Sequence, residues 1–144
     1  MIDMQHFRTN ITNSPFNMPV VQKLIKKTIS QIAGKNKIRI IDPFAREYRQ
    51  PGCITISNDL NPKIDAMYNL EMNDFGELMY EKLLQGEIDQ VDLVFHDPPY
   101  SLRQLKDHYD DIGAHLKQWQ THNMWGRGLD ALAKCVKVGG YAIS

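Results

Sequence analysis

Hydrophobic residues along the chain fall into two patterns: short runs rich in β-branched side chains, and longer stretches with a helical repeat. The run KIRIID at 37–42 is typical of a buried strand, whereas from Pro19 apolar residues recur every three or four positions up to a stop at Gly34. Five strands are expected, at 37–42, 53–59, 66–70, 91–96 and 139–144. Helices are expected between Pro19 and Gly34, at 73–85 and at 124–137. Strands that alternate with helices predict an α/β fold with a mostly parallel sheet.

A single domain over residues 1–144 is expected, because the chain has no internal repeat, low-complexity tract or long linker. Residues 1–18 are polar and predicted to be irregular, and the polar segment 101–123 is longer than a plain connection. That segment is interpreted as a lid or target-contact segment, or as a solvated helix whose leucines pack on the sheet. The chain ends inside its last predicted strand, which favours a sheet truncated after the fifth strand. The alternatives are an open edge or a protein partner that covers it.

Composition narrows the functional class only slightly. Lys plus Arg equals Asp plus Glu, at 17 each, so no global positive field points to a nucleic acid, although a basic patch is compatible with a neutral protein. Cys53 and Cys135 are isolated, and the five histidines have no metal-ligand spacing. The N-terminus lacks a signal-peptide pattern, and no run has membrane-spanning length. A cytoplasmic protein without a metal site is expected.

Acidic residues follow four of the predicted strands, at Asp42, Asp59, Glu71 and Asp97. A single acid at such a position is commonly a helix N-cap, which is the alternative for each one. The carboxyl ends of parallel strands meet at one edge of the sheet, where ligands bind in open α/β folds, so four acids there predict a site. Asp59, after the second strand, is suited to accept the hydroxyls of a ribose, and Glu71 to accept an exocyclic amine of adenine. The pattern predicts a pocket for an adenosine-bearing cofactor.

The fourth predicted strand ends in HDPPYS, which combines an acid, two prolines and an aromatic ring. The side chain of Asp97 and the rigidly held carbonyl of Pro98 provide two acceptors, which suit the two hydrogens of an exocyclic amino group. Tyr100 provides a flat face on which an aromatic ring can stack. The alternative for an isolated DPP is a type I turn.

These residues resemble the amino-methyltransferases, which use S-adenosylmethionine to methylate exocyclic nitrogens of adenine or cytosine and carry a motif of the DPPY type. The resemblance covers essentially the whole chain: SPFNMPVVQKLI is similar to the segment before motif I, IIDPFA to motif I, ISNDLNP to motif II, NLEMNDF to motif III and LAKCVKVGGYAIS to the approach to the fifth strand. DPFAR, ITISNDLNP and DPPYSLRQ together look closest to adenine-specific DNA methylases common in phages and mobile elements. The cofactor-binding residues implied by the resemblance are Asn17, Asp42, Pro43, Phe44, Ala45, Arg46, Asp59, Leu60, Asn61, Glu71, Met72 and Asp97.

The resemblance implies a Rossmann-like class I methyltransferase fold and methyl transfer from S-adenosylmethionine to DNA, with N6 of adenine as the favoured target. The target base would leave the duplex to reach the pocket. The setting would be the cytoplasm of a bacterial or phage-infected host cell. The implied catalytic residues are Asp97, Pro98, Pro99 and Tyr100. The residues expected to contact nucleic acid are Tyr100, Ser101, Arg103, Lys106 and Tyr109.

Motif I of this chain departs from the family pattern, because FAREY at 44–48 has none of the expected glycines. Glycines there let the backbone approach the cofactor. Arg46 offers a guanidinium that can pair with the methionine carboxylate, or that forms a surface ion pair with Glu47 or another neighbour. Two other functions stay open. One is a catalytically silent or partner-dependent binding subunit, and the other is an RNA or protein amino-methyltransferase.

Overall fold

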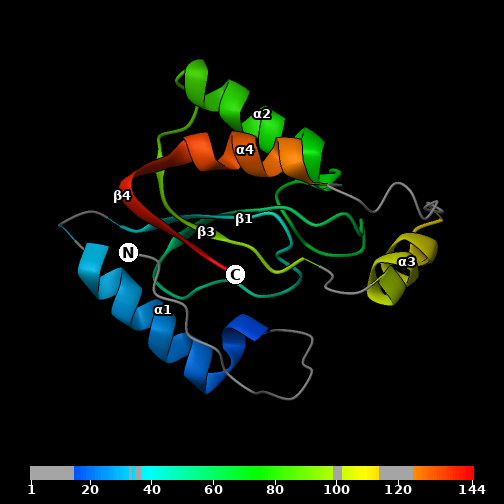
Figure 1. Ribbon diagram of the computed structural model, residues 1–144, viewed down its shortest axis with the longest axis horizontal. Coiled ribbons are helices and arrows are strands. Elements are labelled where there is room, and N and C mark those ends of the chain that lie inside the picture. The colour runs from blue at the N-terminus through cyan, green and yellow to red at the C-terminus, as the bar shows by residue number, and fades with distance from the viewer. Residues whose placement is uncertain (1–14, 33, 35–36, 99–101, 114–124) are drawn as a thin grey trace.

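A four-stranded, all-parallel sheet forms the centre of the protein (Figure 1). The computed structural model describes residues 15–32, 34, 37–98, 102–113 and 125–144, without the side chains of residues 102, 103 and 108. The strands are β1 (Arg39–Asp42), β2 (Ile54–Ser57), β3 (Val91–Phe95) and β4 (Val136–Ile143), in the order β2-β1-β3-β4. The predicted α/β class with a parallel sheet is therefore confirmed.

The strand expected at 66–70 was a wrong prediction, because the described residues there form only an isolated bridge between Asn58 and Tyr68. Asn58 accounts for this, since its side-chain amide occupies the backbone groups that a ladder would use. Its Nδ2 donates to the carbonyl of Leu70 at 3.0 Å, and its Oδ1 accepts from the amide of Leu70 at 3.0 Å. The sheet therefore has four strands where five were predicted.

The last helix and strand meet earlier than predicted. Helix α4 (Gly126–Cys135) ends at Cys135, and β4 begins at Val136 without an intervening loop. The amide of Val136 still donates to the carbonyl of Ala133, while its own backbone is already extended. The expected helix at 124–137 and strand at 139–144 thus exist with a shifted boundary.

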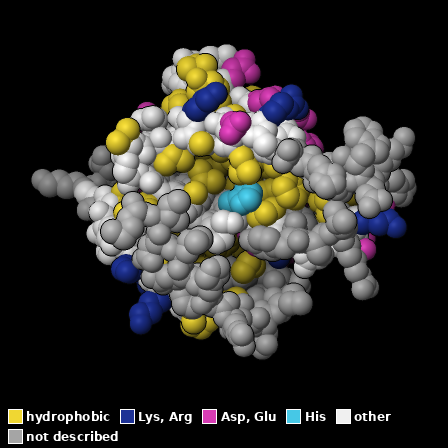
Figure 2. All heavy atoms as spheres, in the orientation of Figure 1, with side chains coloured by type: hydrophobic (Ala, Val, Ile, Leu, Met, Phe, Trp, Pro, Cys, Tyr) yellow, Lys and Arg dark blue, Asp and Glu magenta, His cyan; other side chains and the backbone are white. Residues whose placement is uncertain are grey.

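Helices cover both faces of the sheet (Figure 1). The 3-10 turn η1 (Pro15–Asn17) and α1 (Pro19–Ile32) lie on one side, and α2 (Met72–Leu84) and α4 lie on the other. Neighbouring strand residues point to opposite faces, so Ile40 packs in the cluster with Phe16 and Ile25, whereas Ile41 packs in the cluster with Phe75. Figure 2 shows dark-blue Lys and Arg side chains over α1 and charges of both signs over α2 and α4.

Two glycines set the distance between α2 and α4. A Cβ atom on Gly76 would lie 2.4 Å from the carbonyl oxygen of Gly128, and one on Gly128 would lie 2.6 Å from the carbonyl oxygen of Met72. Only glycine fits at this contact between the two backbones. The close packing holds the amino-terminal ends of α2 and α4 beside the carboxyl ends of the strands.

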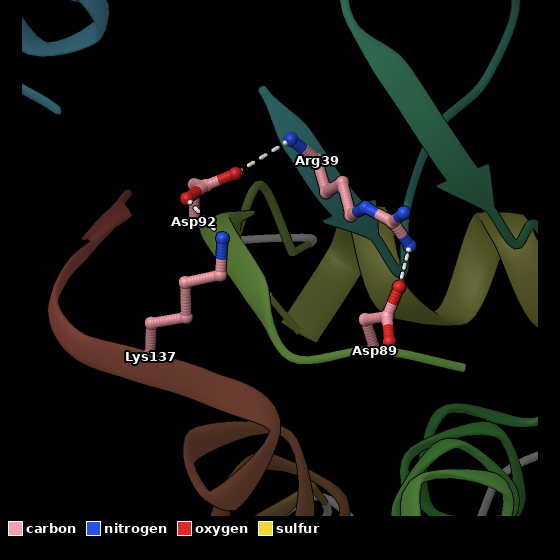
Figure 3. Close-up of polar contacts among 4 residues, drawn as sticks. All are labelled: Arg39, Asp89, Asp92 and Lys137. Carbon is pink, nitrogen blue, oxygen red and sulfur yellow. Dashed lines mark hydrogen bonds and ion pairs between the residues drawn. The ribbon is translucent and has the colours of Figure 1, made fainter. Parts of the chain in front are cut away.

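The amino end of the sheet contains a network of charges around one buried carboxylate (Figure 3). Asp92 on β3 is buried, and its Oδ2 accepts from the backbone N–H of Arg39 on β1 at 2.8 Å. Its Oδ1 accepts from Nζ of Lys137 on β4 at 3.0 Å. Arg39 pairs with Asp89 at 2.8 Å (Figure 3). One carboxylate therefore joins three strands at the place where the β3–β4 register shifts between Val91 and Leu93.

Helix α3 (Leu102–Asp111) follows β3 and lies beyond the carboxyl ends of the strands (Figure 1). It occupies the first part of the segment interpreted as a lid or a solvated helix. Its Leu105 is buried while Gln104 and Lys106 are exposed, so the helix is amphipathic. Among the described helices, none is both long enough and apolar enough to cross a membrane.

Candidate functional site

A cavity of about 570 Å³ lies at the carboxyl ends of β1, β2 and β3. Its wall combines the loops that follow these three strands with residues from η1, α2, α3 and the residue before α4. This is the position at which open parallel sheets bind ligands. The implied cofactor residues in the wall are Asn17, Pro43, Phe44, Arg46, Asp59, Leu60, Asn61, Met72 and Asp97.

Three of the implied cofactor residues lie outside the cavity wall. Asp42 and Ala45 are buried, and Glu71 sits between two residues of the wall. Sequence reasoning missed seven wall residues: Glu47, Tyr48, Asn58, Ile64, Leu70, Asp111 and Trp125. Asn58 could have been found, because it directly precedes Asp59 at the end of a strand. Trp125 could not, since it falls in the stretch 124–137, for which the sequence predicts only a helix.

The glycine-free loop after β1 uses its backbone amides within the protein. The N–H of Phe44 donates to Oδ1 of Asp42 at 3.2 Å, and the N–H of Ala45 donates to the carbonyl of Asn58 at 2.9 Å. The N–H of Arg46 donates to Oδ2 of Asp59 at 3.0 Å. These three amides are engaged by protein acceptors, so recognition of a ligand falls to the side chains of the loop.

Arg46 has a φ of 47°, in the left-handed region that favours glycine. Glycine adopts this conformation without a steric penalty, whereas a residue with a Cβ atom does not. A left-handed non-glycine residue costs roughly 1–2 kcal/mol. Strained backbone of this kind clusters at ligand sites, and the guanidinium of Arg46 faces the cavity.

Arg49 stabilises the loop from its outer side, a role that sequence reasoning missed. Its Nη1 donates to the carbonyls of Arg46 at 3.0 Å and Tyr48 at 2.6 Å, and more weakly to that of Ala45 at 3.4 Å. Its Nη2 donates to the carbonyl of Asp65. A guanidinium with donors in a rigid fork can bind several carbonyls at once, and here it joins the loop after β1 to the carbonyl of Asp65.

Asp59 supports two loops as well as the cavity wall. Its Oδ2 accepts from the N–H of Arg46, and its Oδ1 accepts from the N–H of Asn61 at 2.9 Å. An ionised carboxylate has about four acceptor positions, so each oxygen keeps one for a ligand. The geometry is compatible with the predicted role of Asp59 as an acceptor of ribose hydroxyls.

Asp42 lies beneath the cavity and is only 1% exposed. The pKa of Asp42 is raised to about 7, mainly by burial and to a smaller extent by the charges of Asp97 and Asp59. The N–H of Phe44 and the charge of Arg49 lower the pKa without reversing the effect. The carboxylates at this end of the sheet therefore interact, and the most buried of them resists ionisation.

Asp97, the acid of the DPPY motif, is 7% exposed and lines the cavity. Its Oδ2 lies 3.8 Å from Nη2 of Arg46, which forms an ion pair between the first and third strand ends. Pro98 is buried beside it. The predicted substrate residues Pro99, Tyr100 and Ser101 lie outside the described residues, as does the side chain of Arg103.

Glu71 caps α2 and has a second, unsatisfied acceptor. Its Oε2 accepts from the N–H of Asn73 at 2.8 Å, which is the N-cap role weighed from the sequence. Its Oε1 is buried and has no hydrogen-bond partner among the described residues. The pKa of Tyr109, a residue of the cavity wall, is raised to about 12, mainly by burial and to a smaller extent by the charge of Glu71 and a hydrogen bond with its side chain. The carboxylate of Glu71 therefore lies next to Tyr109 and the cavity.

The two described side chains of α3 that were expected to contact nucleic acid lie in different surroundings. Tyr109 is buried in the cavity wall with the implied cofactor residues. Lys106 is exposed and lies 4.0 Å from Asp110 across one helical turn. Leu105 is buried, as the solvated-helix interpretation expected. The inner face of α3 thus contributes to the cavity, and its outer face carries charge.

Aromatic rings close the side of the cavity next to β3. Phe44 packs edge-on against Trp125, at 5.3 Å between ring centroids, and against His96 at 5.7 Å. Burial lowers the pKa of His96, and its Nδ1 lies 3.3 Å from Oγ of Ser144. Its Nε2 is buried without a hydrogen-bond partner among the described residues. His96 therefore packs behind Phe44 at a strand end and does not itself line the cavity.

No group of three or more His, Cys, Asp or Glu side chains within the described part of the chain is arranged to hold a metal ion. Comparison with protein-family models, with curated proteins and with solved structures found no match to this chain. The function is therefore inferred from the site itself and from the sequence motifs that it brings together.

Proposed function

We propose that the protein transfers a methyl group from S-adenosylmethionine to an exocyclic amino group of a DNA base, with N6 of adenine as the favoured target. One observation carries the proposal: a single cavity joins Asp59, Arg46 and Asp97, which come from the ends of three neighbouring strands. The DPPY motif, with its resemblance to amino-methyltransferases, supports the choice of an amine as the substrate.

The cavity fits an adenosine-bearing cofactor. Its volume of about 570 Å³ lies within the range of small-molecule sites, roughly 300–1,000 Å³. Asp59 keeps acceptor capacity for ribose hydroxyls, and Oε1 of Glu71 is a buried acceptor that lacks a donor among the described residues. Buried acceptors without a partner are rare, and an exocyclic amine would satisfy this one.

S-adenosylmethionine would supply an electrophilic methyl carbon, whose bond to sulfur breaks with the electron pair left on sulfur as the new carbon–nitrogen bond forms. Asp97 would orient the amine by accepting one N–H, and the carbonyl of Pro98 would accept the other. The methylated nitrogen carries an extra proton, which Asp97 would accept or pass to water. The resemblance assigns Tyr100 to stack on the target base.

A binding subunit without catalytic activity is the second candidate, and one observation favours it. Three amides of the loop after β1 already donate to protein acceptors, so the loop offers little backbone recognition to a cofactor. RNA or a protein amide stays an alternative substrate for the same chemistry. Binding of S-adenosylmethionine distinguishes the methyltransferase from a binding subunit without activity. The preferred substrate then distinguishes a DNA methyltransferase from one that acts on RNA or protein.

Calorimetry with S-adenosylmethionine is the first test. We expect micromolar binding to the wild type and its loss in Asp59→Ala, whereas Asp59→Asn should retain part of the affinity because an amide oxygen can still accept from one ribose hydroxyl. Asp74→Ala serves as the matched control, because Asp74 is an exposed acid in the first turn of α2. A folded wild type that does not bind the cofactor would contradict the proposal.

Methyl transfer to unmethylated duplex DNA is the second test, with RNA and protein as competing substrates. We expect transfer to DNA and a loss of at least roughly a hundredfold in Asp97→Ala, in the range that general acid–base groups contribute. Tyr100→Ala should raise the KM for DNA, because the target base loses the ring on which it would stack. Full activity in Asp97→Ala would overturn the role assigned to that carboxylate.

A further inference from the structure

Arg46 is the cationic side chain that connects the cofactor and substrate parts of the cavity. Its backbone N–H is held by Asp59, its φ of 47° is left-handed, and its guanidinium lies 3.8 Å from Asp97. We propose that Arg46 exchanges partners: it pairs with Asp97 before the ligand binds, and then with the carboxylate at the amino-acid end of the ligand, which leaves Asp97 to accept the amine.

The geometry supports an exchange of this kind rather than a permanent bond. At 3.8 Å the ion pair is longer than a charge-assisted hydrogen bond, which measures about 2.7–2.9 Å. The side chain of Arg46 is 31% exposed and that of Asp97 is 9% exposed, so the guanidinium reaches solvent within the cavity while the acid stays buried. A planar guanidinium prefers bidentate pairing with a carboxylate, and a ligand carboxylate would allow that geometry.

The backbone of the loop explains why this task falls to a side chain. In a glycine-rich loop, backbone amides bind the ligand directly. Here the amides of Phe44, Ala45 and Arg46 are engaged by Asp42, Asn58 and Asp59. The strained residue therefore supplies through its side chain the positive charge that the backbone no longer provides.

The exchange rests on the proposed function and predicts an order of binding. Arg46 neutralises Asp97 until the carboxylate-bearing ligand is present, so the acid becomes available to an amine only afterwards. Removing the charge of Asp97 should therefore tighten the binding of a ligand that carries the carboxylate. It should do so only while Arg46 is present.

The test compares two nucleosides by calorimetry. S-adenosylhomocysteine carries the amino-acid end, whereas methylthioadenosine has a methyl group in its place. Arg46→Met should lower the affinity for S-adenosylhomocysteine roughly tenfold to a hundredfold, and the affinity for methylthioadenosine less than about twofold. Asp97→Asn should raise the affinity for S-adenosylhomocysteine roughly twofold to fivefold. This gain should vanish when Asp97→Asn is added to Arg46→Met in the double variant. Arg127→Met is the matched control, because Arg127 pairs with Glu77 on the surface.

The outcomes separate this inference from the proposed function. If both nucleosides bind the wild type and Arg46→Met weakens them equally or not at all, the exchange is wrong while cofactor binding stands. Weaker binding of S-adenosylhomocysteine in Asp97→Asn would also overturn it, because Asp97 would then be a direct ligand of the amino-acid end. If neither nucleoside binds to a folded wild type, both the exchange and the proposed function fail.

Discussion

The two ends of the sheet each bury acidic side chains, and they treat them differently. At the amino end, Asp92 accepts from the backbone of Arg39 and from the ammonium of Lys137, so a neighbouring cation balances its charge (Figure 3). At the carboxyl end, Asp42 is buried near two other acids, and its pKa is raised to about 7. The same residue type thus joins strands at one end and accumulates around a cavity at the other.

The difference teaches which buried acids belong to the fold and which belong to a site. A buried carboxylate that serves only stability is paired and hydrogen-bonded, because an uncompensated charge costs several kcal/mol. A buried acid whose pKa is raised by desolvation opposes folding at neutral pH, and such arrangements persist where a ligand or a reaction uses them. The carboxyl end fits the second description.

The largest effect that would test this comparison is expected from Asp42→Asn. The pKa of Asp42 in the folded protein lies above its ordinary value of 3.8, so its contribution to stability is fully present below pH 3.8 and is lost as the pH rises towards about 7. Asn cannot ionise and keeps the acceptor for the N–H of Phe44. At pH 8 the variant should be more stable than the wild type, by at most about 4 kcal/mol.

Urea unfolding from pH 4 to pH 8 measures this effect, as the difference between the two proteins at each pH. The difference should be small at pH 4 and grow towards pH 8. A constant difference, or a less stable variant at pH 8, would show that Asp42 is compensated in the way Asp92 is, and the contrast between the two ends would disappear.

Asp92→Ala should have the next largest effect, in the opposite direction. The variant leaves the N–H of Arg39 without its acceptor and Lys137 without its counter-ion, so the free energy of unfolding should fall by about 3 kcal/mol. Urea unfolding at pH 7 measures the loss. Asp89→Ala is the control: Asp89 also pairs with a cation, but its side chain is 74% exposed, so its loss should stay within about 0.5 kcal/mol. Equal effects in the two variants would mean that the Asp92 network does not stabilise the sheet.

The fold class could be predicted from the sequence because strands and helices differ in the spacing of their hydrophobic residues. This spacing can be read without knowledge of tertiary contacts. The strand at 66–70 was predicted wrongly because a side chain, that of Asn58, pairs with the backbone there in place of a strand. The boundary between α4 and β4 was missed because Val136 and Lys137 also continue a helical pattern.

The candidate site was predictable where it lies at strand ends, since topology brings those residues together. Asp59 and Asp97 line one cavity as the parallel-sheet rule predicts. Arg49 and the ion pair between Arg46 and Asp97 were not predictable, because they depend on the path of a loop without glycine. The spacing of hydrophobic residues does not determine the backbone path of such a loop.

The smallest effect concerns the strain at Arg46, and two variants isolate it. Arg46→Gly and Arg46→Ala remove the same guanidinium, so they lose the ion pair with Asp97 equally, but only Ala keeps a Cβ atom at a φ of 47°. Glycine adopts this conformation without the steric penalty, so Arg46→Gly should be about 1 kcal/mol more stable than Arg46→Ala in urea unfolding. If Arg46→Ala is as stable as Arg46→Gly, the loop is not strained, and the position of the Arg46 guanidinium at the carboxyl end does not lower the stability of the fold. If the difference appears, a strained cation faces a cavity lined by acids at one end of the sheet, while the other end has its charges balanced by unstrained neighbours.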